Sequence, residues 1–118
     1  MYELDVIKQS ALAKKMGGPP IFNDGFLHKV TINPDSITLD IKILSRSNPL
    51  LQKDTFVRLL LHGIHSYRFE STDVSHTLMI IHDLDIRREK DRLRMLLESN
   101  TGELSEVLFE QIELVEKE

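Results

Sequence analysis

The chain has 118 residues, of which 41% are apolar and 29% are charged, and its net charge is −4. These values are typical of one folded domain and exclude a disordered chain. There is no cysteine, which excludes a disulfide framework, a thiolate zinc site and a cysteine nucleophile and suits the reducing cytoplasm, where we expect the protein. The N-terminus lacks a signal-peptide pattern, and the longest apolar runs fall far short of a membrane span. We therefore expect no membrane partner.

The charges are unevenly distributed. Residues 98–118 hold seven glutamates and one lysine, a net charge of −6, whereas residues 87–94 carry +3. Aromatic residues are sparse and tryptophan is absent, so the balance argues against nucleic acid as a partner. We expect an acidic strand beside a basic one, joined by cross-strand pairs.

The first 20 residues predict an N-terminal arm. Residues 4–15 place apolar side chains at a rough 3.6-residue period, which predicts a short helix. The Gly17-Gly18-Pro19-Pro20 segment then ends it. Residues 21–116 are expected to form a β domain, so that the chain is a single domain with an arm.

From residue 21 onward the apolar period becomes two. Residues 27–44 alternate around Asn33-Pro34-Asp35-Ser36, a sequence typical of a turn, and predict a hairpin. Residues 45–54 read as a loop and residues 57–61 as a third strand. Gly63 then marks a bulge or bend before an extended segment, 64–69, and residues 78–81 form a further apolar run, followed by residues 83–88.

The last third of the sequence allows two interpretations. Residues 93–97 alternate as a strand, and Asn100-Thr101-Gly102 fits a hairpin loop. Beyond it the apolar phase slips between Leu104 and Val107, and again before Ile112. Strands with two bulges would explain both slips. A helix would also fit, because these residues follow i, i+3, i+4 spacing.

Five histidines are candidate metal ligands: His28, His62, His65, His76 and His82. His62 and His65 would face opposite sides of a strand unless a bulge intervened, and no metal-binding spacing occurs. No nucleophile elbow or phosphate-binding glycine loop is present either. The sequence therefore predicts a protein that is not an enzyme and uses no metal or cofactor.

One segment resembles a known family. Residues 22–30 (Phe-Asn-Asp-Gly-Phe-Leu-His-Lys-Val), followed by strand, turn and strand, resemble the opening of small bacterial immunity-type proteins of polymorphic toxin systems, the immunity-protein-50-like sequences. Residues 109–114 (Phe-Glu-Gln-Ile-Glu-Leu) resemble their final strand. Asn23 stands where many relatives carry histidine. The resemblance implies a protein partner, a toxin to be neutralised, and names no catalytic residue.

We therefore predict a mainly β fold, a single antiparallel sheet or sandwich-like domain of about seven or eight strands with a short N-terminal helix. The predicted function is non-catalytic protein binding, with Asp24 and His28 as binding candidates that would otherwise fasten the first hairpin through side-chain hydrogen bonds. An alternative is a small-molecule-binding or hydrolytic site using His82, Asp83 and Asp85. A third is a structural subunit that self-associates into a homo-oligomer through a strand edge.

Overall fold

The computed structural model describes residues 21–49, 51, 53–69 and 79–116. The predicted helix at 4–15 and the Gly17–Pro20 segment lie outside these residues. Every element of the described part is a strand, and all neighbouring strands pair antiparallel. The eight strands are β1 (Phe26–Ile32), β2 (Ser36–Ile43), β3 (Thr55–His62), β4 (Ser66–Arg68), β5 (Met79–Glu89), β6 (Arg92–Ser99), β7 (Leu104–Phe109) and β8 (Gln111–Glu116). The prediction of a mainly β antiparallel fold is confirmed.

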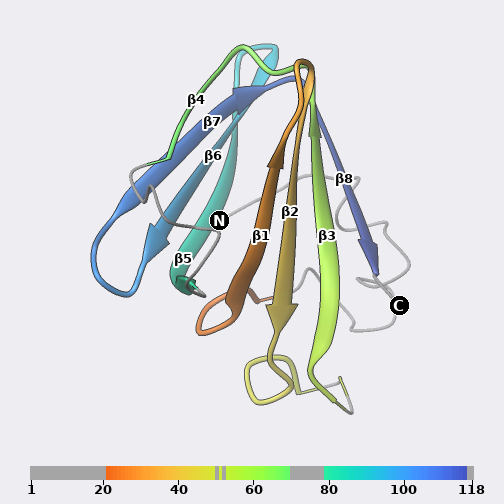
Figure 1. The fold of residues 1–118 in the computed structure, drawn as a ribbon, viewed down its shortest axis with the longest axis vertical. Coiled ribbons are helices and arrows are strands. Elements are labelled where there is room, and N and C mark those ends of the chain that lie inside the picture. Colours follow the sequence, from red (N-terminus) through yellow and green to blue (C-terminus); the bar gives the residue numbers. More distant parts are fainter. Residues whose placement is uncertain (1–20, 50, 52, 70–78, 117–118) are drawn as a thin grey trace.

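The strands form one sheet in the order β4-β7-β6-β5-β1-β2-β3-β8. Figure 1 shows two halves, β4 to β7 in one and β1, β2, β3 and β8 in the other. β1 and β5 join the halves through two paired positions, Phe26 with Ile80 and Leu27 with Met79. The chain passes from β7, the second strand in this order, to β8, the last strand, across the top of the view (Figure 1). The sheet therefore folds over into two halves, and β8 is an edge strand of the second half.

The core lies between the inner faces of the two halves. Alternate residues of β2 and β3 are fully buried, as the period of two requires for a sheet with one covered face. The same pattern recurs on β6 and β7. The largest fully buried side chains are Phe22, Phe109, Leu27, Ile37, Leu39, Ile41, Ile43, Leu59, Leu61, Ile81 and Ile86. Both halves contribute to this single cluster.

The predicted hairpin at 27–44 is confirmed. β1 and β2 pair from Phe26 opposite Lys42 to Ile32 opposite Ile37. The turn between them is closed by a hydrogen bond from the Asn33 N–H to the Ser36 carbonyl, 2.8 Å. The turn residues and the apolar alternation both predict this hairpin, which is why the sequence identifies it clearly.

In the predicted loop at 45–54, the residues that the structure describes form no strand or helix, and buried Asn48 organises them. The Ile21 N–H donates to Asn48 Oδ1 at 2.7 Å, and Asn48 Nδ2 donates to the carbonyls of Ile21 and Leu44 at 3.0 and 2.9 Å. The Ser45 N–H donates to Asp54 Oδ1 at 2.9 Å, and this hydrogen bond lowers the pKa of Asp54. One amide side chain thus ties the start of the described chain to the loop after β2.

The C-terminal third is strand, so the helix interpretation of residues 104–116 is wrong. The expectation of two bulges is also corrected. Leu104 points outward and Ser105 takes the inner position, so the first phase slip needs no bulge. The second slip is a bend at Glu110, where the strand leaves β7 and continues as β8 in the other half of the sheet. Strands that change sheet halves commonly do so at such a bend.

Gly63 is a bend, as predicted, with a φ of +71°. A Cβ there would lie 2.9 Å from the Cβ of Glu110, so the bends after β3 and β7 pack directly on each other. The extended segment predicted at 64–69 is shorter in the structure, where only Ser66–Arg68 pairs, with β7. Residues 79–89 form one long strand with an irregularity between Ile81 and Asp83.

Candidate binding surface

The turn before β1 contains the binding candidate Asp24, followed by Gly25. Asp24 has a φ of 67°, and its N–H donates to the Ile81 carbonyl at 2.8 Å. A Cβ on Gly25 would lie 2.6 Å from the carbonyl oxygen of Lys42, a distance that only glycine avoids. The Asn23 side chain donates to the His82 carbonyl at 2.7 Å. These contacts fasten the turn to β2 and β5.

The turn is held by hydrogen bonds other than those expected from the Asp24 and His28 side chains. The bonds that hold the turn come from the Asn23 side chain and from the backbone of Asp24. His28 Nε2 is buried and has no hydrogen-bond partner among the residues that the structure describes. The position at which the resemblance expects histidine, Asn23, is thus a structural anchor in this chain.

His28 and His82 both occupy β-bulges. His28 is the extra residue between Leu27 and Lys29 on β1, and His82 is the extra residue between Ile81 and Asp83 on β5. Bulges change the direction in which a side chain points, which is why they are frequent near functional sites. The two pairs that join β1 to β5, Phe26 with Ile80 and Leu27 with Met79, lie between them, because His28 follows Leu27 whereas His82 lies beyond Ile80, beside Asn23. They therefore belong to different parts of the surface.

The five candidate site residues do not converge on one site. Asp24 and His82 lie at the same turn and are exposed, as is Asp83. The Asp85 carboxylate is buried and accepts a hydrogen bond from Arg87 Nε. A surface hollow of about 410 Å³ lies elsewhere, at the β5–β6 hairpin, lined by Glu89, Lys90, Asp91, Arg92 and Leu108.

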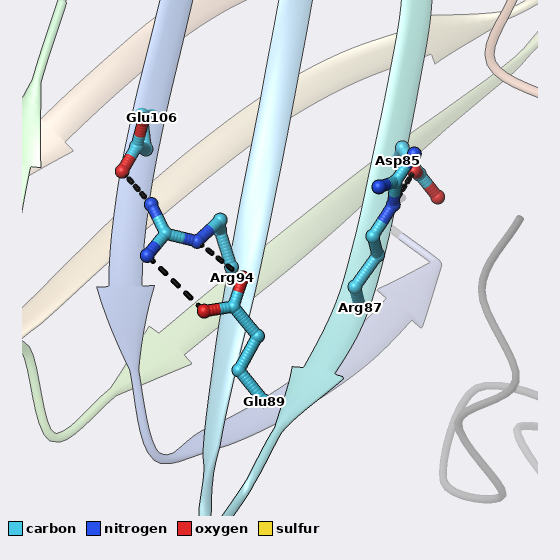
Figure 2. Close-up of polar contacts among 5 residues, drawn as sticks. All are labelled: Asp85, Arg87, Glu89, Arg94 and Glu106. Carbon is cyan, nitrogen blue, oxygen red and sulfur yellow. Dashed lines mark hydrogen bonds and ion pairs between the residues drawn. The ribbon is translucent and has the colours of Figure 1, made fainter.

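The outer face of β5, β6 and β7 carries the predicted contact between basic and acidic residues. Arg94 donates to Glu89 on β5 and to Glu106 on β7, as Figure 2 shows. The hydrogen bond from Arg94 lowers the pKa of Glu89. Next to these two contacts, Arg87 Nε donates to the carboxylate of Asp85 on the same strand, β5 (Figure 2). The glutamates at 110, 113 and 116 lie away from these arginines, at the bend and on β8.

The outer face of β3 and β8 forms a different surface, which we call the β3–β8 surface. Its members point outward because their neighbours in sequence fill the core. The register places Arg58 opposite Val115, Leu60 opposite Glu113 and His62 opposite Gln111, and Phe56 lies one pleat beyond Arg58. The β3–β8 surface comprises Phe56, Arg58, Leu60, His62, Gln111, Glu113 and Val115.

Exposed apolar side chains mark one end of the β3–β8 surface. Phe56 is 40% exposed and Val115 is 37% exposed. The Phe56 ring packs against the His28 ring with centroids 5.1 Å apart and a tilt of 58°, and Lys42 Nζ lies 5.9 Å from the Phe56 centroid. An aromatic ring that packs against its neighbours, yet is still open to solvent, is the kind of group on which protein interfaces are centred.

Arg58 lies beside these apolar groups, and Asp40 on the neighbouring strand β2 holds its guanidinium through hydrogen bonds. Arg58 Nε donates to Asp40 Oδ1 at 2.7 Å and Nη2 to Asp40 Oδ2 at 3.4 Å. The Asp40 side chain is 7% exposed and that of Arg58 is 37% exposed, so the guanidinium still reaches solvent. This hydrogen bond raises the pKa of Arg58. The surface thus presents a fixed positive charge next to an aromatic ring.

The β7–β8 corner, which adjoins the other end of the β3–β8 surface, carries two histidines that contact glutamates. His65 Nε2 lies 2.8 Å from Glu110 Oε2, and His62 Nε2 lies 3.8 Å from Glu113 Oε1. The bend at Gly63 brings both histidines to the β7–β8 corner, which the strand spacing alone argued against. Within the described ranges, no group of three or more histidine, aspartate or glutamate side chains could hold a metal ion.

Comparisons with known proteins identify a similar fold. No family model and no curated protein matches this chain. The chain is similar to a crystal structure of an uncharacterized protein from Neisseria gonorrhoeae, with a TM-score of 0.57 over 80% of this chain and 92% of that one. The two sequences are 12% identical, so the likeness shows the fold alone. In the part of this chain that the structure describes, no helix is long and apolar enough to cross a membrane.

The sequence contained a signal for the β3–β8 surface that its motifs did not reveal. Alternation predicts that Phe56, Arg58 and Leu60 face away from the buried Val57, Leu59 and Leu61. Nothing in a period of two indicates that these residues lie beside Glu113 and Val115. That neighbourhood requires the pairing of β3 with β8.

Proposed function

We propose that this chain is a non-catalytic protein-binding domain and that its partner docks on the β3–β8 surface. The observation that carries the proposal is the exposure of Phe56 and Val115 beside Arg58 on one regular face. Aromatic residues and arginine are enriched among the side chains that dominate protein interfaces. Glu113 and His62 provide a polar rim on the same face.

The class of partner is proposed from the resemblance of residues 22–30 and 109–114 to immunity-type proteins. On this proposal the partner is a toxin, and the chain neutralises it by covering part of its surface. Phe109–Leu114 includes the bend at Glu110 and the start of β8, so this segment supplies Glu113 to the β3–β8 surface. Binding, rather than chemistry on the toxin, would be the source of protection.

Capture experiments with matched variants test the proposal. The immobilised full chain is incubated with lysate of its native host, alongside Phe56→Ser and Tyr67→Ser variants. Tyr67 is the control because it is an exposed aromatic residue on β4, in the other half of the sheet. Thermal unfolding checks that both variants remain folded. Wild type and Tyr67→Ser should retain one protein at stoichiometric levels, and Phe56→Ser should lose about tenfold or more in affinity.

Two outcomes would overturn the proposal. One is recovery of no stoichiometric protein by the wild-type chain. The other is equal retention of the partner by folded Phe56→Ser. The immunity-type function has its own readout, because expression of the captured protein should arrest growth of a bacterial host. Co-expression of wild type should relieve that arrest, whereas co-expression of Phe56→Ser should relieve it poorly.

A further inference from the structure

The edge of the sheet at β8 suggests how a partner engages this domain. β8 is the last strand in the sheet order, and among the described strands it pairs only with β3. A strand bonded on one side directs its remaining backbone N–H and C=O groups outward, which is a template for another strand. We propose that an extended, basic segment of the partner protein adds to β8 as a further strand. The inference rests on the proposed function and specifies its partner.

The side chains of β8 define what that segment must carry. Ile112 and Leu114 face the core side, and Glu113 and Val115 face outward on the β3–β8 surface. An added strand would place its alternate residues beside these two sets. Apolar residues are required next to Ile112 and Leu114, and a lysine or arginine next to Glu113. The segment therefore alternates apolar and basic residues.

Charge distinguishes this occupant from a second copy of the chain. Within Gln111–Val115 of β8, the charged residue is Glu113. Two β8 strands paired across a two-fold axis would bring like charges together, which is unfavourable between neighbouring strands. The Glu113 side chain is 57% exposed, and its contact with His62 is long, 3.8 Å. A cationic segment would find this carboxylate accessible.

Two synthetic peptides test the inference on the full chain. One is an eight-residue peptide in which valine alternates with lysine, and the other replaces each lysine with glutamate. Binding is measured by fluorescence anisotropy for wild type, Glu113→Lys and Asp91→Lys. Asp91 is the control because it is an exposed acid at the β5–β6 hairpin, away from β8. Hydrogen exchange of the backbone amides locates the bound peptide.

The lysine peptide should bind wild type and Asp91→Lys within about twofold of each other and the glutamate peptide about tenfold more weakly. Glu113→Lys should lose about tenfold for the lysine peptide. Amides of Gln111–Glu116 should exchange more slowly in the complex. Equal binding of both peptides, undiminished binding by Glu113→Lys, or protection on another strand would overturn the inference. Dimerisation of the free chain through β8 would also overturn it.

The failure of this inference is distinguishable from the failure of the proposed function. If the captured partner is lost by Phe56→Ser but fully retained by Glu113→Lys, the partner binds the β3–β8 surface without adding a strand to β8. If no partner is captured at all, the proposed function itself fails.

Discussion

Arg58 on β3 holds the carboxylate of Asp40 on β2 through two hydrogen bonds, although both side chains point away from the core. The two residues are direct cross-strand neighbours, so the contact needs no distortion of the sheet. Asp40 is nearly covered, whereas Arg58 reaches solvent. The pair therefore positions the guanidinium on the β3–β8 surface and ties β2 to β3.

A double-mutant cycle measures this coupling. Asp40→Ala and Arg58→Ala should each lower the midpoint of urea-induced unfolding. Together they should lower it by less than the sum of their separate effects, because either change breaks the same two hydrogen bonds. Full additivity of the two effects would show that the residues act independently.

The contact between Arg94 and Glu89 predicts a specific dependence of stability on pH. The hydrogen bond from Arg94 holds the pKa of Glu89 below its ordinary 4.5. A carboxylate with a lowered folded-state pKa stabilises the fold above its unfolded-state pKa, and this stabilisation is lost as pH falls through the folded-state pKa. The difference in unfolding midpoint between wild type and Glu89→Gln should thus be constant from about pH 7 to pH 5 and shrink below about pH 4. A difference that persists unchanged at low pH would contradict the prediction.

Two buried serines should respond oppositely to the same substitution. Among the described residues the buried Ser105 hydroxyl has no hydrogen-bond partner, so Ser105→Ala should be neutral or raise the free energy of unfolding by up to about 1 kcal/mol. Ser99 Oγ accepts from the N–H groups of Thr101 and Glu103, at 3.3 and 3.1 Å. Ser99→Ala should therefore lower the free energy of unfolding by about 1 kcal/mol. Chemical denaturation measures both, and equal effects would refute the distinction.

Asn48 should be among the costly positions outside the apolar core. Its side chain makes three hydrogen bonds to the backbone of Ile21 and Leu44. Asn48→Ala would leave these backbone groups unsatisfied in a buried place, and we expect a loss of about 2 kcal/mol in the free energy of unfolding. Asn33→Ala, at the exposed hairpin turn, is a control of the same chemistry. A loss no greater than that of Asn33→Ala would show that water replaces the bonds of Asn48.

Gly63 should tolerate no other residue without cost. Its positive φ disfavours any side chain by about 1–2 kcal/mol. An added Cβ would also press on the Cβ of Glu110, 2.9 Å away. Gly102 also has a positive φ, 88°, but no atom of the described residues lies within 4 Å of an added Cβ, so it isolates the backbone contribution. Gly63→Ala should thus destabilise more than Gly102→Ala in thermal unfolding, and equal losses would exclude a role for Glu110.

The first hairpin shows how far sequence patterns reach. Its turn residues and its alternation specify the same structure, and both can be read within one short stretch of chain. At 104–116 the patterns conflicted, because Leu104 occupies an outward position and Ser105 an inward one. The sequence could not distinguish a misplaced apolar residue from a bulge, because both produce the same slip of phase.

The candidate site residues show more clearly what sequence patterns cannot predict. The residue types of His28 and His82 make them candidates from the sequence, but the bulges that carry them arise from mismatched registers with β2 and β6. The anchoring role of Asn23 depends on the His82 carbonyl, far along the chain. Such contacts exist only once β1 and β5 are neighbours.

The sequence by itself determined the antiparallel β class, the first hairpin, the bend at Gly63 and the face of β3 that points outward. Each of these follows from local chemistry, because a period of two and a turn residue act within a few positions. The tertiary structure alone decided that the outward residues of β3 lie beside those of β8, and that β8 forms the edge of the sheet. The physical reason is that pairing between distant strands depends on how the whole sheet folds over its core, and no local periodicity encodes that pairing.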